Sequence, residues 1–424
     1  MNLIVKPVDW IEGTVKAPPS KSYTHRAIII ASLADGRSII HEPLISGDTI
    51  ASINACKSLG SGIEVKERKL TIDGNSGRPE PIESIINVQN SGTTIRFMAS
   101  VSALCNRKVT LTGDESIQKR PIGPLLKALE QLGAQVSSSK GRPPVTVHGP
   151  MKGGKCTIKG DISSQFISSL LISLPLTERG GEILIEGKLK SRPYVEMTLE
   201  MLQRFGARID SYINKFRIKG NQVYGGIEYT VEGDYSSSAF IMAAASLIDS
   251  KLRIENLCSE SKQGDRKIVE ILDKMGSEIR TGRNYVEIRG DGNLNGIEID
   301  MSDIPDLVPI VAVLGSLANG KTLIKNVGHL RYKESDRLHS ITTELRKIGA
   351  DIRERKDYLE INGVKELKSA KLHGWNDHRI VMSLAVVALR ANENVVIDSA
   401  ESIGISFPEF IETMKALGCD ISVG

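Results

Sequence analysis

The sequence contains one pattern six times, and this repeat limits the folds that the chain can adopt. In each copy a helical pattern ends in a glycine and an alternating, strand-like pattern follows. A glycine at this place is typical of a left-handed C-terminal helix cap. Successive glycines are 69 to 73 residues apart: Gly60, Gly133, Gly206, Gly276, Gly349 and Gly418. The 424 residues are therefore predicted to hold six copies of one structural unit.

Each copy also contains a helix of small and apolar residues, a turn and a β-branched strand, as in "SSQFISSLLISLPLTERGGEILIEG". Together the two halves predict the order βαβαββ, with the apolar helices buried. A chain of this length usually forms two domains, which gives three copies to each. The segments "KAPPS" and "YGGIEYTVEGD" resemble crossings between domains. We predict an α/β fold with one domain of residues 1–15 plus 230–424 and a second of residues 16–229.

Composition narrows the function classes. With 40% hydrophobic and 25% charged residues the chain is typical of a globular protein, and no apolar run is long enough to span a membrane. The first residues lack a secretory pattern, so we expect a cytoplasmic protein. The five cysteines are widely spaced and form no C-x-x-C pair, which predicts neither disulfides nor a zinc site. A net charge of +4 and 4% aromatic residues argue against nucleic acid as a partner and suit a small anionic ligand.

The first helix of every copy is predicted to start with polar residues. These starts are Lys21, Ser22 and Arg26; Asn90, Ser91, Gly92, Thr93 and Arg96; Ser163, Ser164 and Gln165; Asp234, Ser236 and Ser237; Asp303 and Asp306; and Asn376, Asp377, His378 and Arg379. A single one of them is most simply an N-cap. Several helix N-termini that converge would form a strong site for an anion.

Basic residues also occur at the starts of second helices, at Arg120 in "QKRPIG" and in "RYKESDRL", while "SRPYVEM" adds Ser191 and Tyr194. Cations oppose the helix dipole at this end, so their presence predicts a ligand with several negative groups. A duplicated scaffold that serves only stability is the alternative that the repeat by itself leaves open.

The segment "GSLANGKT" at residues 315–322 has the spacing of a phosphate-binding P-loop. Its context is wrong, because an apolar helical pattern precedes the glycines and a strand pattern follows them. The chain also lacks H-E-x-x-H, G-x-S-x-G and dinucleotide-binding motifs. We therefore expect no nucleotide hydrolase, metal site, serine hydrolase or dehydrogenase.

Several segments together resemble the 5-enolpyruvylshikimate-3-phosphate synthase family of enolpyruvyl transferases, over essentially the full length. They are "PPSKSYTHRA", "NSGTTIR", "KRPI", "SSQF", "SRPYVEMT", "IPD", "KESDR", "NDHR" and "SFPEF". The resemblance implies a two-domain inside-out α/β barrel with ligands in the cleft between the domains. It implies transfer of the enolpyruvyl group of phosphoenolpyruvate to the 5-hydroxyl of shikimate 3-phosphate, on the pathway to chorismate and the aromatic amino acids. It also implies that no metal or organic cofactor takes part. The sequence contains no obvious oligomerisation helix, so we expect a monomer.

The resemblance assigns roles to residues whose motifs match. Shikimate 3-phosphate would contact Lys21, Ser22, Arg26, Ser163, Ser164, Gln165, Ser191 and Tyr194, with Asn90 also among the substrate-binding residues. Phosphoenolpyruvate would contact Lys21, Gly92, Arg120, Arg337 and Arg379. Proton transfer would involve Asp306, Lys333 and Glu334, with Lys21 also catalytic, and Asp306 and Lys333 would touch the shikimate hydroxyls. Ile405 and His329 stand where the family commonly has a lysine and an asparagine.

Two other functions are weighed against this one. The related transferase that acts on UDP-N-acetylglucosamine typically carries a reactive cysteine before the second helix of its second unit, but this chain has no cysteine between Cys105 and Cys156. A non-catalytic scaffold that only binds anions would bind them less strongly with the acids Asp306 and Glu334 among its cations. Both features favour the synthase.

Overall fold

The computed structural model describes residues 1–424, and the chain divides into two compact units. The inserted unit is Pro19–Val231, and the split unit consists of Met1–Pro18 and Glu232–Gly424. These boundaries lie three and two residues beyond the predicted ones. Strand pairing explains the shift, because Lys16 still pairs with Glu255 in the split unit while Thr230 pairs with His41 in the inserted unit.

The inserted unit contains three four-stranded sheets and the helices between their strands. In spatial order the sheets are β14 (Glu228–Thr230), β3 (Arg37–His41), β5 (Lys69–Asp73), β4 (Gly62–Lys66); β6 (Ile85–Asn87), β7 (Lys108–Thr112), β9 (Arg142–His148), β8 (Gln135–Ser139); and β10 (Gly154–Lys159), β11 (Gly181–Glu186), β13 (Lys215–Ile218), β12 (Ile209–Ser211). The helices are α1 (Lys21–Ser32), α2 (Gly47–Ser58), α3 (Gly92–Ser102), α4 (Glu115–Lys119), α5 (Gly123–Gln131), α6 (Ser164–Ser173) with the 3₁₀ turn η1 (Leu174–Leu176), and α7 (Arg192–Arg204).

The split unit also has three four-stranded sheets. They are β2 (Trp10–Lys16), β15 (Asp249–Glu255), β17 (Tyr285–Asp291), β16 (Glu278–Thr281); β18 (Glu298–Asp300), β19 (Lys321–Lys325), β21 (Tyr358–Asn362), β20 (Asp351–Glu354); and β22 (Lys371–Leu372), β23 (Val395–Ile397), β1 (Leu3–Val5), β24 (Ile421–Val423). Its helices are α8 (Tyr235–Leu247), α9 (Ile268–Met275), α10 (Val308–Leu317), α11 (Arg337–Lys347), α12 (His378–Ala388) and α13 (Phe410–Ala416), with 3₁₀ turns η2 (Gly264–Lys267), η3 (Pro305–Leu307), η4 (Gly328–Tyr332) and η5 (Ala400–Ile405). The predicted α/β fold class is confirmed.

Every sheet has the same pairing: its first two strands are parallel and its remaining pairs are antiparallel. Three sheets are nevertheless completed by a strand from a distant part of the chain. β14 joins the sheet of β3, β2 joins the sheet of β15, and β1 joins the sheet of β23 and β24. The repeated unit is therefore continuous in the sequence for only three of the six sheets.

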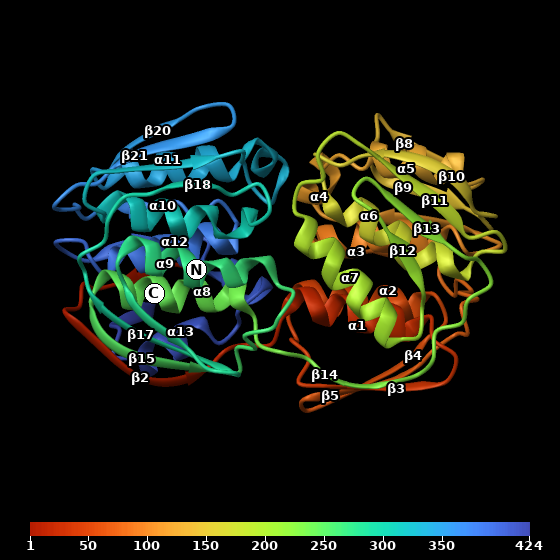
Figure 1. Ribbon diagram of the computed structural model, residues 1–424, viewed down its shortest axis with the longest axis horizontal. Helices are drawn as coiled ribbons and strands as arrows, with labels where there is room; N and C mark the ends of the chain where they lie inside the picture. Colours follow the sequence, from red (N-terminus) through yellow and green to blue (C-terminus); the bar gives the residue numbers. More distant parts are fainter. The chain divides into compact units, whose positions relative to one another are not determined.

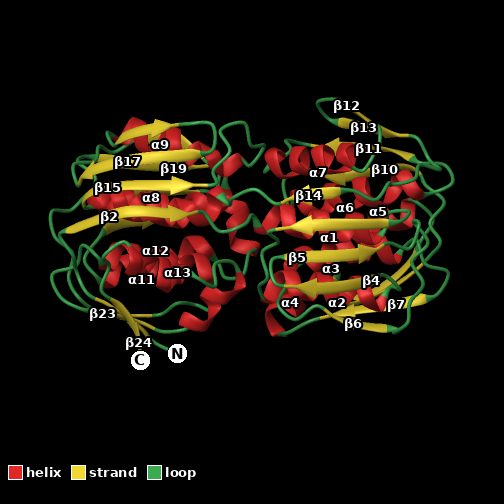
Figure 2. Cartoon of the chain, turned by 90° about the horizontal axis from the view of Figure 1, so that it is seen from below, coloured by secondary structure: helices red, strands yellow, loops and turns green.

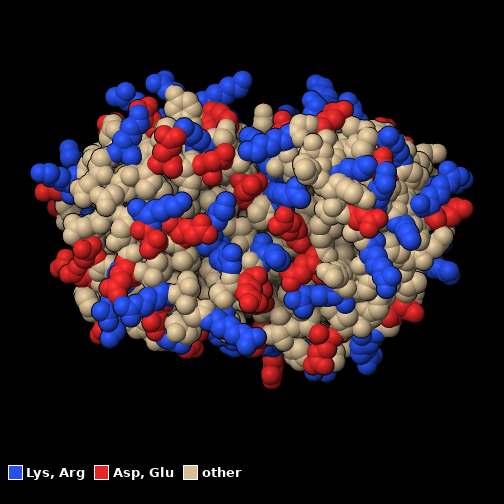
Figure 3. Space-filling view, in the orientation of Figure 1, with Lys and Arg blue, Asp and Glu red and all other residues tan.

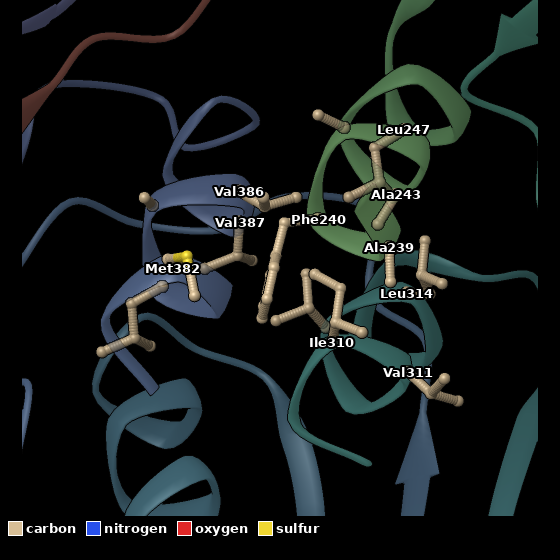
Figure 4. Close-up of a cluster of buried hydrophobic side chains, with 14 of the residues drawn as sticks. Ala239, Phe240, Ala243, Leu247, Ile310, Val311, Leu314, Met382, Val386 and Val387 are labelled. Atoms are coloured by element: carbon tan, nitrogen blue, oxygen red, sulfur yellow. The ribbon is translucent and has the colours of Figure 1, made fainter. Parts of the chain in front are cut away.

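Buried helices form the core of each unit. In the split unit all residues of α8 are buried, and α8, α10 and α12 pack against one another. Figure 1 places these helices between the sheet of β20 and β21 and the sheet of β2 and β15, and Figure 2 shows α8 partly behind β15 and β2. Figure 4 shows Phe240 of α8 between Ile310 of α10 and Val387 of α12. The prediction that the apolar helices are buried is confirmed.

The six repeated glycines all have φ between 90° and 108°, the left-handed conformation that the helix caps were predicted to need. The segment with the P-loop spacing runs from the end of α10 into β19, so it leads from a helix into a strand and is no P-loop. Not one helix combines the length and apolar character that crossing a bilayer would take. On the face drawn in Figure 3, basic and acidic side chains are interspersed.

Candidate functional site

In the inserted unit, the first turn of α1 carries Lys21, whose ammonium lies 2.9 Å from a carboxylate oxygen of Asp48 on α2. Burial alone would raise the pKa of Asp48, but Lys21, and then His25 and Ser91, outweigh burial and hold that pKa well below its ordinary value. Asp48 is therefore a carboxylate that holds the catalytic candidate Lys21 in place.

A chain of buried polar side chains continues from this pair across α1, α2 and α3. His25 Nδ1 lies 2.8 Å from Ser52 Oγ, Ser52 Oγ lies 2.7 Å from Thr94 Oγ1, and Thr94 Oγ1 lies 2.7 Å from Ser91 Oγ. Burial lowers the pKa of His25, although Asp48 opposes the shift. Since buried polar groups are costly unless bonded, this network fixes the three helix starts relative to one another.

Arg26, one turn after Ser22 on α1, is buried and bonded to neutral groups. It donates to Thr198 Oγ1 at 2.8 Å, to the Ser22 carbonyl at 2.8 Å and to the Tyr194 carbonyl at 2.7 Å. Burial lowers its pKa to about 10, while Tyr23 and Tyr194 act in the opposite direction. The guanidinium stays charged at neutral pH and joins α1 to the start of α7, where Ser191 is the N-cap in a left-handed conformation.

The starts of α3 and α6 meet through side chains. Gln165 Nε2 donates to Thr93 Oγ1 at 2.8 Å, and its Oε1 accepts a short hydrogen bond from Arg96. Ser163 caps α6 through the backbone N–H of Gln165, Ser164 is its first residue, and Asn90 lies just before the N-cap Ser91 of α3.

Arg120 was predicted to lie at the start of a second helix. It instead directly follows the short helix α4, three residues before α5, because Pro121 separates the two helices. Its guanidinium lies so close to Gly92 that a Cβ there would be 2.5 Å from Arg120 Nη1, so a side chain at the first position of α3 would displace the Arg120 guanidinium. Apart from Arg120, the candidates of the inserted unit thus lie at or near helix starts.

In the split unit, three cations surround Asp306, which lies in η3 just before α10. Its carboxylate is 2.9 Å from Arg337 Nη1, 3.1 Å from Arg379 Nη2 and 3.5 Å from Lys333 Nζ. Burial would raise the pKa of Asp306, but Arg379, Lys333 and Arg337 hold it well below its ordinary value against the opposing charge of Glu334. Asp306 is therefore a carboxylate at neutral pH.

Arg337 binds two more acids. Its Nε lies 2.8 Å and its Nη2 3.2 Å from the carboxylate of Asp377, and Nη2 also donates to Glu334 at 2.6 Å. Burial would lower the pKa of Arg337, but Asp377, Glu334 and Asp306 together raise it. The structure therefore brings all five candidates of this unit, Asp306, Lys333, Glu334, Arg337 and Arg379, into one group.

One further acid of this group, Asp265 in η2, was missed by the sequence analysis. Ser236 at the start of α8 donates a short hydrogen bond to it. Burial and the charge of Asp306 raise the pKa of Asp265 to about 7, and Arg379 partly opposes them. Asp265 and Asp306 are thus two neighbouring carboxyl groups whose pKa values are shifted in opposite directions.

Asp48 was missed for the same reason as Asp265. Each lies at the start of the second helix of its copy, in "SGD" and in "QGDRK". The prediction of site residues at second-helix starts covered only three of the six copies, and the copies with Asp48 and Asp265 were not among them. A comparison of all six would have found both acids.

Comparisons with known proteins show the family of the chain. A family profile described as EPSP synthase (3-phosphoshikimate 1-carboxyvinyltransferase) matches residues 5–414. The 3-phosphoshikimate 1-carboxyvinyltransferase of Methanocaldococcus jannaschii is 48% identical over 99% of both chains, and that of Methanococcoides burtonii is 49% identical over 97% of both.

Solved structures are similar along the whole chain. The EPSP synthase of Acinetobacter baumannii superposes with a TM-score of 0.82 at 26% identity, covering 100% of both chains. The enolpyruvyl transferase NikO of Streptomyces tendae has a TM-score of 0.81 at 16% identity, with 99% of this chain and 98% of that chain covered, and shares the fold. This chain belongs to the EPSP synthase family, the 3-phosphoshikimate 1-carboxyvinyltransferases.

Proposed function

We propose which residues of this chain bind the two substrates and which transfer protons in the reaction of its family. EPSP synthases transfer the enolpyruvyl group of phosphoenolpyruvate to shikimate 3-phosphate in aromatic amino acid biosynthesis, and phosphate is released. The new bond joins the 5-hydroxyl oxygen to the central carbon of phosphoenolpyruvate. One set of residues must bind two phosphorylated acids, and another must move protons.

The inserted unit supplies most contacts to shikimate 3-phosphate. Helix starts with free N–H groups and hydroxyls suit a phosphate, and Arg26 uses three of its five N–H donors on neutral acceptors and keeps charge for an anion. The proposed contacts are Lys21, Ser22, Arg26, Asn90, Ser163, Ser164, Gln165, Ser191 and Tyr194.

Phosphoenolpyruvate is bound mainly by arginines. Arg120 and Arg379 can each donate two parallel hydrogen bonds to a carboxylate or a phosphate. Arg337, whose Nε, Nη1 and Nη2 already donate to Asp377, Asp306 and Glu334, would add charge and at most one further hydrogen bond. Lys21 adds a point charge, and Gly92 leaves room beside the guanidinium of Arg120. His329 and Ile405 carry no assigned contact.

Proton transfer is proposed for the group around Asp306. The carbon under attack becomes electrophilic when the methylene of phosphoenolpyruvate is protonated, a step assigned to Lys333 or Glu334. The 5-hydroxyl gives its proton to Asp306 as the oxygen–carbon bond forms. The tetrahedral intermediate then loses phosphate by cleavage of a carbon–oxygen bond, and its methyl group returns one proton.

The observation that carries this proposal is the set of three cations within 3.5 Å of Asp306. They keep the carboxylate ionised, as a base requires, and they offer charge to an anionic substrate.

Phosphate release tests the function. The purified protein is incubated with phosphoenolpyruvate and either shikimate 3-phosphate or UDP-N-acetylglucosamine. We expect release only with shikimate 3-phosphate. Release only with the UDP-sugar would assign the chain to the other transferase, and binding without release would make it a scaffold.

We also propose that the two units are the two domains, each with three copies of the βαβαββ unit in an inside-out α/β barrel. The buried helices α8, α10 and α12, with sheets around them, support this arrangement in the split unit. A monomeric enzyme of the cytoplasm completes the proposal.

A further inference from the structure

The loop that leads from β22 into α12 has an unusual backbone. Trp375 and Asn376 both have positive φ, 57° and 50°, although neither is a glycine. Left-handed residues of this kind persist only where surrounding contacts hold them. The loop ends at Asp377, which caps α12 and binds Arg337, and Arg379 follows two residues later. Whatever holds this loop therefore also places two of the proposed phosphoenolpyruvate contacts.

Glu344 holds the loop from α11. Its side chain is fully buried, and one carboxylate oxygen accepts from the backbone N–H of His373 at 2.9 Å. The other oxygen accepts from Trp375 Nε1, also at 2.9 Å. Lys347 Nζ donates to both oxygens, at 2.9 and 2.7 Å. A buried carboxylate with these partners fixes both the backbone and the indole of the loop.

Helix α11 also binds the segment 373–377 at a second point. Arg337 begins α11 and binds Asp377, while Glu344 lies seven residues later. Seven residues are close to two full turns, so both side chains lie on about the same face of α11. The segment 373–377 is thus held at its start by Glu344 and at its end by Arg337. The ring of Trp375 also contacts His339 and His373, with centroids 5.7 and 5.2 Å away.

We propose that Glu344 is a positioning residue for the transferase reaction: through the loop 373–376 it sets the places of Asp377, Arg337 and Arg379. The inference rests on the phosphoenolpyruvate contacts proposed above. Glu344 itself touches no residue assigned to substrate. Its replacement should therefore affect the use of phosphoenolpyruvate more than the use of shikimate 3-phosphate.

Glu344→Gln is the main test, because it keeps the size of the side chain and places an amide NH₂ against one of two N–H donors of the loop. We expect the KM for phosphoenolpyruvate to rise about ten- to a hundredfold, since small displacements of charged contacts have effects of this size. The KM for shikimate 3-phosphate should stay within about twofold, since Glu344 shares no partner with most of its proposed contacts.

Two further variants serve as controls. Lys347→Met removes the cation but leaves both bonds from Glu344 to the loop, and it should keep the wild-type KM for phosphoenolpyruvate. Trp375→Phe removes one donor and should raise this KM in the same direction but less than Glu344→Gln. If Glu344→Gln fails to fold, Trp375→Phe decides the matter.

Tryptophan fluorescence provides a readout of the loop itself. The chain has two tryptophans, and Trp10 is exposed on β2, so a Trp10→Phe background leaves Trp375 as the reporter. Glu344→Gln should shift its emission to longer wavelength together with the rise in KM. A wild-type KM for phosphoenolpyruvate in Glu344→Gln, or an equal loss for both substrates, overturns the inference. A wild-type protein that releases no phosphate would count against the proposed function instead.

Discussion

Two buried arginines of this protein, one in each unit, are held in different ways. In the inserted unit Arg26 is buried among neutral acceptors, a hydroxyl and two backbone carbonyls. In the split unit Arg337 is buried among three carboxylates, those of Asp377, Glu334 and Asp306. Burial dominates in the first case and lowers the pKa of the arginine, whereas the acids dominate in the second case and raise it.

This difference indicates different uses. A cation among neutral groups keeps its charge for an incoming anion, because no carboxylate competes with the anion. A cation among acids binds anions less strongly but keeps a carboxylate such as Asp306 ionised and in place. This difference fits the roles proposed above, in which Arg26 binds a phosphorylated substrate and the group around Asp306 transfers protons.

The largest expected effect comes from removing the central acid. Asp306→Ala should lower turnover about 10²- to 10⁴-fold, the usual cost of losing a positioned base. Shikimate 3-phosphate should still bind within about tenfold of wild type, since most of its proposed contacts belong to the inserted unit. Phosphate release and isothermal titration measure the two quantities. Near-normal turnover would refute the catalytic role, and abolished binding would make Asp306 a substrate anchor.

Replacing one arginine in each unit by methionine compares the two environments directly. Arg337→Met leaves buried carboxylates without their cation and should lower the free energy of unfolding by about 3–5 kcal/mol. Arg26→Met loses hydrogen bonds to neutral groups and should cost about 1–2 kcal/mol, while it weakens binding of shikimate 3-phosphate. Urea unfolding of both variants provides the measurement. Equal losses of unfolding free energy in the two variants would show that the acids around Arg337 do not make its environment different from that of Arg26.

Adding a cation to the split unit is a milder change. Ile405, half-buried at the end of η5, stands where the family commonly has a lysine. One added charge-assisted hydrogen bond is worth roughly 1.5–3 kcal/mol, so Ile405→Lys should lower the KM for phosphoenolpyruvate about ten- to a hundredfold. Steady-state kinetics with varied phosphoenolpyruvate test this. An unchanged or higher KM would mean that another residue already provides the contact.

The smallest effect concerns pH. The pKa of Asp265 is raised to about 7 in the folded protein, above its ordinary value near 3.8. In acid Asp265 is protonated in both the folded and the unfolded chain, so it does not lower the free energy of unfolding. As pH rises toward 7, the unfolded chain loses this proton more readily than the folded protein, and the free energy of unfolding falls. Above pH 7 this loss of stability is complete. Asp265→Asn lacks this cost, so above pH 7 its Tm should exceed that of wild type by roughly 2–6 °C.

Melting curves from pH 4 to pH 9 separate Asp265 from Asp306. Asp306 has the opposite effect on the pH dependence of stability, because its pKa is lowered. Its ionised form stabilises the folded protein at neutral pH, and this contribution is lost only in acid. A Tm difference between Asp265→Asn and wild type that does not vary with pH would contradict the raised pKa of Asp265.

Much of the fold could be predicted because local rules act within a few residues. The caps at Gly276 and Gly418 need only a residue that tolerates positive φ, and the buried helix α8 follows from an apolar pattern on all faces. The candidate site was found in part for the same reason, since Ser91, Ser163 and Asp377 are N-caps with a local sequence pattern.

Strand pairing and buried acids could not be predicted in the same way. β14 and β1 are three-residue strands, and so short a pattern does not specify its partner across the chain. Asp48 and Asp265 look like ordinary polar residues at helix starts, and their importance depends on neighbours far away in the sequence.

The sequence by itself determined the sixfold repeat, the helix ends and the residue types gathered at the helix starts, because propensity, capping and hydrophobic periodicity are local. Only the tertiary structure decided which charges meet: that Lys21 binds Asp48, that Asp306 is surrounded by Arg337, Arg379 and Lys333, and that Glu344 holds the loop before Asp377. The physical reason is that pKa values and ion pairs depend on burial and on distances of a few ångströms. Packing of helices from separate copies sets those distances.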